Sequence, residues 1–276
     1  MKRKSDVLYA YGFVRDAFDV TNAPPGLDES AVVVAEGKGV AALISRLPSD
    51  RYSAAEVEQN TGDVNWLSPR AMAHDRVLTW AQEHGGVIPL PMFSLWGSDA
   101  ALAKELTKRA TALKRIFKRV GGADEFGVRV YRRDDVMLQS LGDLDPDIAE
   151  LRREANAASP GQRYLLERKI ADQGKRAARA ASQRLAKQVF DELKPLARGA
   201  LARPLVPESG RATEATLVLN GAFLVDRSRL DDFRSALGER VRALQPRGLA
   251  FDFSGPWPPY NFVAEKERPK TRRGAK

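Results

Sequence analysis

Few side chains in this sequence are suited to catalysis. It contains two histidines, His74 and His84, and no cysteine. The lack of cysteine excludes cysteine nucleophiles, thiolate metal sites and disulfides. His74 shares an apolar stripe with Leu67, Ala71 and Leu78 at helical spacing. A histidine in such a stripe is more often a core residue bonded to a carbonyl than a general base or a ligand, and we favour the core interpretation.

One glycine-rich loop resembles a phosphate-binding loop. Glu36-Gly37-Lys38-Gly39 separates two apolar, β-branched runs, residues 31–35 and 40–44. A phosphate loop needs an earlier glycine and a Ser or Thr directly after the lysine, and both are missing. We therefore predict a β-hairpin here. Since no carboxylate pair, nucleophile–base pair or metal-ligand cluster stands out elsewhere, the sequence predicts neither an enzyme nor a cofactor or metal site.

Positive charge is the second chemical feature. The net charge is +9, with ten Lys/Arg against four Asp/Glu in residues 163–198 and six against two in residues 264–276, so the rest of the chain is nearly neutral. A basic patch attracts nucleic acid, a membrane surface or an acidic protein. A solvated helix face is the ordinary explanation of such a run, and it stays open beside partner binding. The candidate partner-binding residues are Lys175, Arg176, Arg179, Arg184 and Lys187.

The first half of the chain predicts a small sheet covered by two helices. At 276 residues the chain is long enough for two domains, and no apolar run approaches the length of a membrane helix. Residues 7–14 predict a strand buried on both faces, and the hairpin follows. Ser68-Pro69 predicts the start of a helix that reaches about residue 84, and a second helix is expected over residues 98–120.

The second half predicts another mixed domain. A strand over residues 125–131 is followed by a helical pair that breaks at Ser159-Pro160 and extends towards Arg198. Two strands, a helix and a last strand are then expected over residues 200–206, 214–225, 228–244 and 249–254. Taken alone, Asn220-Gly221 would predict a hairpin turn inside the second of these strands.

The order of these elements defines the predicted fold. One strand, a helical pair, two strands, a helix and a strand indicate a ferredoxin-like domain whose first helix is expanded. The fold class is therefore α+β, with an N-terminal domain over residues 1–120 and a C-terminal domain over 121–264. Residues 265–276 are charged and lack apolar periodicity, so we expect a disordered basic tail.

A proline-aromatic segment follows the last strand. Its prolines remove backbone donors and fix φ near −65°, so we expect an extended, polyproline-like ribbon. Its aromatic rings must be buried, and we expect Trp257 to pack on the C-terminal domain. Replacing Trp257 by alanine would then cost about 3 kcal/mol of stability. The residues of this structural tail are Pro256, Trp257, Pro258, Pro259, Tyr260 and Phe262.

This ending, Gly-Pro-Trp-Pro-Pro-Tyr-Asn-Phe-Val over residues 255–263, resembles the gas vesicle protein F/L family. Other segments match that family in the same order. Tyr9-Ala10-Tyr11-Gly12 lies in the first strand, Glu125–Tyr131 is similar to E-W-G-V-K-V-Y with Phe126 for tryptophan, and Gly161–Leu165 is close to G-x-x-Y-L. Pro91-Met92 departs from the commoner P-L-R-F-G pattern of the family.

The resemblance implies an accessory protein of gas vesicle assembly. Its partners would be the small hydrophobic shell protein and other accessory proteins, its place the cytoplasm and the gas vesicle, and its action binding. The resemblance also implies one bulged strand across Asn220-Gly221. The alternative is a basic ferredoxin-like nucleic-acid-binding protein. We do not favour it, because Phe126-Gly127-Val128 lacks the basic-glycine flank and the second aromatic residue of an RNA-recognition strand. The oligomeric state stays open.

Overall fold

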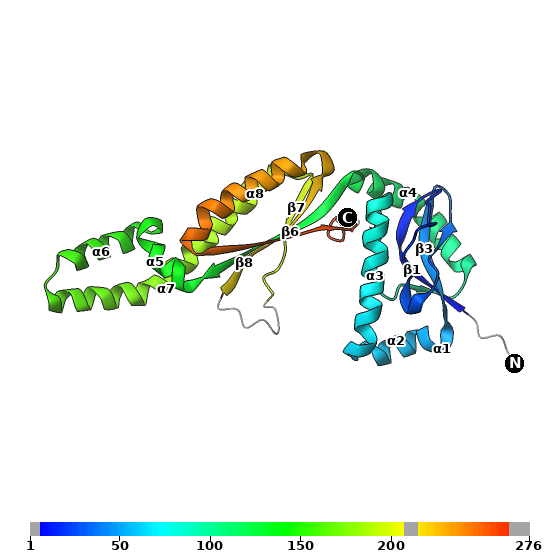
Figure 1. Cartoon of the computed structure of the whole chain (residues 1–276), viewed down its shortest axis with the longest axis horizontal. Coiled ribbons are helices and arrows are strands. Elements are labelled where there is room, and N and C mark those ends of the chain that lie inside the picture. Colours follow the sequence, from blue (N-terminus) through cyan, green and yellow to red (C-terminus); the bar gives the residue numbers. More distant parts are fainter. Residues whose placement is uncertain (1–5, 207–214, 265–276) are drawn as a thin grey trace, which may run out of the picture. The chain divides into compact units, whose positions relative to one another are not determined.

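The computed structural model describes residues 6–206 and 215–264, which form two compact units (Figure 1). The first unit contains residues 6–124 and 257–264, and the second contains residues 125–256. The boundary between the two units thus lies inside a strand, a few residues after residue 120, where we predicted the domain boundary. The larger difference concerns the tail, which we expected in the C-terminal domain but which belongs to the first unit. The predicted disordered segment 265–276 lies outside the described residues.

The first unit is built on an antiparallel sheet in the order β2-β3-β1-β4, with β5 also beside β1. Leu8 to Val14 are buried along β1, which confirms a strand covered on both faces. Gly12 follows a bulge in the pairing of β1 with β3. A Cβ atom there would lie 2.6 Å from the Val87 side chain, so glycine lets β4 approach. The strands are β1 (Asp6–Arg15), β2 (Val33–Glu36), β3 (Val40–Pro48), β4 (Ile88–Pro89) and β5 (Leu95–Trp96).

The helices of the first unit differ from the prediction mainly at the start of α3. This helix begins at Val64, because the Asp63 carboxylate accepts a hydrogen bond from the Asn65 N–H at 2.9 Å and caps it there. Pro69 consequently lies inside α3. Ser98 caps α4 as predicted. The helices are α1 (Ser49–Tyr52), α2 (Ala54–Asn60), α3 (Val64–His84) and α4 (Asp99–Val120); α1 and α2 were not predicted.

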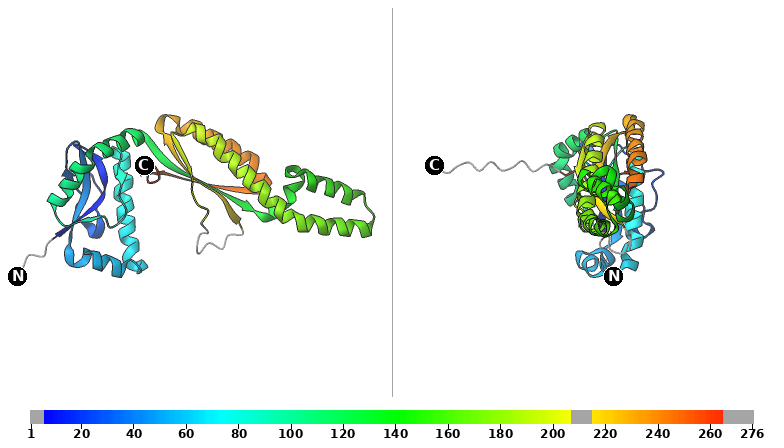
Figure 2. Two further views of the ribbon diagram at one scale, coloured as in Figure 1. Left: turned by 180° about the vertical axis from the view of Figure 1, so that it is seen from behind. Right: turned by 90° about the vertical axis from the view of Figure 1, so that its left-hand side faces the viewer.

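The second unit is built on a four-stranded sheet in the order β7-β8-β6-β9. Helices α6 and α7 run side by side as a hairpin that extends beyond the strands of this unit, as both views show (Figures 1 and 2). With 34 residues, α7 is about 50 Å long. The elements are β6 (Ala123–Arg133), α5 (Asp134–Leu144), α6 (Pro146–Ala157), α7 (Pro160–Leu193), β7 (Gly199–Ala202), β8 (Ala215–Asp226), α8 (Leu230–Leu244) and β9 (Leu249–Trp257).

Strand β8 runs unbroken through Asn220-Gly221, as the family resemblance implied. A tight hairpin would need positive φ angles at these residues, and neither has one. Gly221 serves packing instead, because a Cβ atom there would lie 2.7 Å from the Phe223 ring. The implied bulge is absent from the pairing with β7, which is regular over residues 221–224.

The core of the second unit contains a group of phenylalanine rings between α7, α8 and the sheet. Phe233 of α8 is fully buried, with its ring centroid 5.3 Å from that of Phe223 and 6.3 Å from that of Phe253. Phe126 stacks on Phe253 at 5.3 Å. Phe126 is 1% exposed, so its ring cannot stack on a nucleotide base as an RNA-recognition strand requires.

Candidate functional site

The five basic residues predicted to bind a partner all lie on α7, and all are exposed. Two of them have partners within the chain. Arg184 donates a hydrogen bond from Nη2 to the backbone oxygen of Leu144 at 2.8 Å. Lys187 forms an ion pair with Asp191, one turn further along the helix. These two side chains are therefore less available to a second molecule than the other three.

Lys175, Arg176 and Arg179 form no ion pair or side-chain hydrogen bond with the part of the chain that the structure describes. At about 100° per residue, these three residues lie within roughly one third of the helix circumference. Tyr164 and Leu165, near the start of α7, fall in the same arc and are 63% and 65% exposed. Exposed apolar side chains that adjoin one another mark contact surfaces. We call these five residues the outer face of α7.

A second basic face, which we did not predict, lies on α4. Lys104, Lys108, Arg115 and Lys118 recur at helical spacing and are all exposed. The helix holds seven Lys/Arg against two Asp/Glu, whereas α7 holds eight against four over a longer span. The spacing could have revealed this face from the sequence. Unlike α7, α4 exposes no large apolar side chain.

The structural tail is held by its prolines and its backbone, and Trp257 is not its anchor. Pro258 and Pro259 are buried, whereas Trp257 is 39% exposed. Arg119 of α4 donates from Nη2 to the backbone oxygens of Phe262 and Ala264 at 2.8 and 3.1 Å. The expectation that Trp257 is buried in the C-terminal domain is therefore wrong. Because much of its surface stays in water, replacing it by alanine should cost less than the 3 kcal/mol expected of a buried aromatic.

The other tail residues also differ from the extended ribbon we expected. The N–H of Tyr260 donates to the oxygen of Pro258 at 2.7 Å, and the N–H of Phe262 donates to the oxygen of Pro259 at 3.0 Å. These bonds fold the tail into turns. Pro256 is exposed at the end of β9, Tyr260 is 41% exposed and Phe262 is half-buried.

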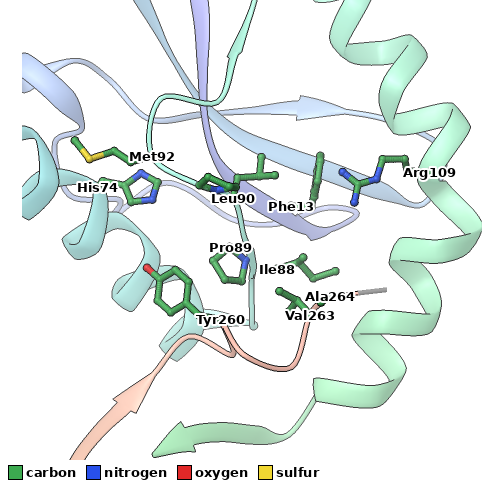
Figure 3. A pocket seen from close by; sticks show the side chains of 11 residues that line it. Phe13, His74, Ile88, Pro89, Leu90, Met92, Arg109, Tyr260, Val263 and Ala264 are labelled. Atoms are coloured by element: carbon green, nitrogen blue, oxygen red, sulfur yellow. The ribbon is translucent and has the colours of Figure 1, made fainter. Parts of the chain in front are cut away.

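A cavity of about 610 Å³ lies in the first unit between α3, α4 and the tail (Figure 3). The segment Ile88–Met92 forms one wall, and Tyr260 and Val263 contribute to another. Pro91 and Met92, which depart from the family pattern, are thus both part of the cavity. Its polar side chains are His74, Arg109 and Tyr260; His74 and Arg109 lie towards opposite ends in Figure 3, and the Tyr260 hydroxyl lies on the His74 side.

His74 is a buried, neutral histidine with one satisfied ring nitrogen. Its Nδ1 lies 2.6 Å from the Tyr9 hydroxyl, a partner that we did not predict, and the ring also makes a hydrogen-bonding contact with the Leu90 backbone. Burial lowers the pKa of His74 to about 4, although the nearby Leu90 backbone opposes the shift. Nε2 is buried and makes no hydrogen bond within the described residues. His84 is exposed and bonds the Trp80 carbonyl on its own helix at 2.8 Å.

Two observations on the described residues concern metal ions and membranes. Within residues 6–206 and 215–264, no group of three or more His, Asp or Glu side chains is arranged to hold a metal ion. No helix in the same residues is both long enough and apolar enough to cross a bilayer.

Comparison with known proteins identifies relatives over almost the whole chain. The family model described as gas vesicle synthesis protein GvpL/GvpF matches residues 7–264. Gas vesicle protein L1 of Halobacterium salinarum is 25% identical over 266 residues, which cover 94% of this chain and 90% of the relative. Gas vesicle protein L of a Streptomyces species is 26% identical, with 85% of each chain covered.

Solved structures show the same fold. The crystal structure of GvpF from an Anabaena species superposes with a TM-score of 0.69 at 20% identity, over 95% of this chain and 97% of that chain. GvpF from Microcystis aeruginosa gives a TM-score of 0.66 at 17% identity, over 94% and 99% of the two chains.

Proposed function

Because the chain belongs to the GvpL/GvpF family of gas vesicle synthesis proteins, we propose that it binds the small hydrophobic shell protein while gas vesicles form. Membership of this family implies a role in gas vesicle formation. The observation that supports shell-protein binding best is the outer face of α7. There two large apolar side chains share one side of a helix with three cations that have no ion-pair partner among residues 6–206 and 215–264.

The two kinds of side chain on this face suit different parts of a partner. Tyr164 and Leu165 offer apolar area that would be removed from water on contact, at roughly 25 cal/mol per Å². Lys175, Arg176 and Arg179 would attract carboxylates and speed the encounter. A shell subunit that exposes apolar surface before assembly would be held in this way, and its aggregation would be limited.

The ferredoxin-like character of the second unit remains part of this proposal. It is supported by the strand order β7-β8-β6-β9 and by helices between β6 and β7 and between β8 and β9. The nucleic-acid alternative is not favoured, because the aromatic rings of this sheet, such as Phe126, pack in the core.

Reversing the three unpaired charges should weaken binding of the shell protein. In the variant Lys175→Glu, Arg176→Glu, Arg179→Glu, we expect the apparent affinity in low salt to fall by about tenfold or more, since several exposed charge pairs would become repulsive. To measure it, the tagged chain is purified after co-expression with the shell protein. The amount of shell protein that co-purifies is then determined over a series of protein concentrations. The effect should shrink as salt is added.

The control for this experiment is on α4. The variant Lys104→Glu, Lys108→Glu, Arg115→Glu makes the same change in net charge on the other basic face, and we expect it to retain binding. Equal losses in both variants would mean that net charge, and not the outer face of α7, attracts the shell protein. Unchanged binding in both would leave the α7 cations as a solvated face.

A further inference from the structure

We propose that the cavity of the first unit binds a short apolar peptide segment that carries an acidic residue. This site is separate from the outer face of α7, so the proposal does not depend on how the shell protein is held. The cavity volume of about 610 Å³ lies in the range of sites that enclose a ligand. Its walls are mainly proline, aliphatic and aromatic side chains (Figure 3), a lining that favours apolar groups.

His74 places a hydrogen-bond donor at one end of this cavity. Burial keeps the Tyr9 hydroxyl protonated, since it raises the pKa of that group well above its usual value. The Phe93 N–H approaches the Tyr9 oxygen at 3.5 Å, which leaves the hydroxyl proton for Nδ1 of His74. A neutral imidazole that accepts at Nδ1 carries its own proton at Nε2. The ligand must therefore offer an acceptor, such as a peptide carbonyl.

The unsatisfied Nε2 is the observation that points to a missing partner. His74 is 5% exposed, and its Nε2 has no hydrogen bond within the described residues. A buried polar group without a hydrogen bond destabilises the fold, and a ligand carbonyl would remove that loss. Met92 lies beside His74 in Figure 3, and its flexible side chain is the one that an entering ligand would displace.

Arg109 supplies the positive charge at the other end of the cavity. Its guanidinium lies over the Phe13 ring at 5.2 Å from the ring centroid. Its contact with Glu105 is long, at 3.9 Å, so the charge is only weakly compensated by that carboxylate. A carboxylate on the ligand would complete the pair. The separation of Arg109 from His74 favours an extended molecule over a compact one.

The edge strand of the sheet helps to decide what kind of peptide contact forms. Pro89 and Pro91 line the cavity and have no N–H group. A ligand strand therefore cannot pair with this edge in a regular ladder. Recognition has to come from side-chain pockets and from the two polar ends, as in grooves lined by aromatic residues.

The test uses the full chain with ¹⁵N-labelled histidine, because the sequence has two histidines and both can be followed by NMR. The probes are the blocked peptide acetyl-Leu-Val-Leu-Asp-Leu-amide, the same peptide with asparagine for aspartate, and decanoate. We expect the acidic peptide to shift the His74 ring resonances and to leave those of His84 unchanged. A His84→Gln variant assigns the two sets of resonances.

Two substitutions that each remove one positive charge test how the acidic residue of the peptide is recognised. Arg109→Met should weaken binding of the acidic peptide by about fivefold and should leave the asparagine peptide unaffected. Lys108→Met, at the neighbouring exposed position, should change neither. The Lys175→Glu, Arg176→Glu, Arg179→Glu variant should bind the acidic peptide like the wild type, which keeps this test independent of shell-protein binding.

Several results would overturn the proposal. One is that the His74 ring resonances do not shift at the highest peptide concentration that can be reached. Another is equal binding of the acidic and asparagine peptides, and a third is an equal loss of affinity in Arg109→Met and Lys108→Met. Binding of decanoate without binding of the acidic peptide would assign the cavity to an apolar small molecule and would also contradict the proposal.

Discussion

Acidification from pH 7 to pH 4 is expected to destabilise the first unit by about 3 kcal/mol through His74 alone. The folded protein holds the pKa of this histidine at about 4, because burial disfavours the charged ring, whereas an unfolded chain has the ordinary value of 6.5. Between these two values the unfolded chain binds more protons, so stability rises with pH across that window. The His74 contribution is complete above pH 6.5 and is lost as the pH falls towards 4.

This loss can be measured by chemical unfolding at a series of pH values. Trp66, Trp80 and Trp96 lie within the first unit, whereas Trp257 is the last residue of β9, so in a Trp257→Phe background tryptophan fluorescence reports on the first unit. In a His74→Phe variant, the fall in unfolding free energy between pH 7 and pH 4 should be smaller by about 3 kcal/mol. Parallel curves for wild type and His74→Phe would mean that the buried histidine does not stay neutral.

Replacing Phe233 by alanine is expected to cost the second unit about 3–5 kcal/mol, the usual range for a buried phenylalanine. This ring is fully buried and contacts the rings of Phe223 and Phe253, so its removal leaves a cavity between α8 and the sheet. Far-UV circular dichroism should show the loss as an earlier unfolding transition. In the Trp257→Phe background the tryptophan fluorescence transition should stay in place, because the three remaining tryptophans lie outside residues 125–256.

The control for Phe233→Ala is Arg242→Ala, an exposed position on the same helix. We expect that variant to change the stability by no more than about 0.5 kcal/mol. A small effect of Phe233→Ala would contradict the assignment of this ring cluster to the core of the second unit.

Local patterns in the sequence predicted most of the elements, and the misses have physical causes. Ser98 fixed the start of α4 because its side chain caps the helix. The start of α3 was placed at Ser68-Pro69, where the cap pattern is good, although Asp63 caps the helix one turn earlier. Helix α5 was missed because it follows β6 directly, without an intervening turn residue. Where a helix begins depends on side-chain packing, which the spacing of apolar residues in the sequence does not reveal.

The tail shows where sequence reasoning about the site fails. Its composition indicated that it must dock, and Pro258 and Pro259 are indeed buried. The mistake was to choose the C-terminal domain because the tail follows the last strand of that domain. Proximity along the chain does not determine where a segment docks. Here Arg119 of the first unit donates hydrogen bonds to the tail backbone. The cavity beside His74 could not be predicted for the same reason, since the tail forms one of its walls.

For the basic residues of α7, in contrast, the sequence predicted the exposure correctly. Their exposure on α7 could be predicted from the alanine-rich stripe opposite them, and Lys175, Arg176 and Arg179 are exposed. The pair of Lys187 with Asp191, four residues further along the helix, could have been predicted from its spacing. The bond of Arg184 to Leu144 could not, because Leu144 lies 40 residues away in the chain.

Hydrogen–deuterium exchange of the chain in its co-expressed complex with the shell protein tests the proposed function most directly. We predict slower exchange than in the free chain along residues 160–187, which contain the outer face of α7, and no comparable change along α4. Protection confined to the first unit, with α7 exchanging as in the free chain, would contradict the account.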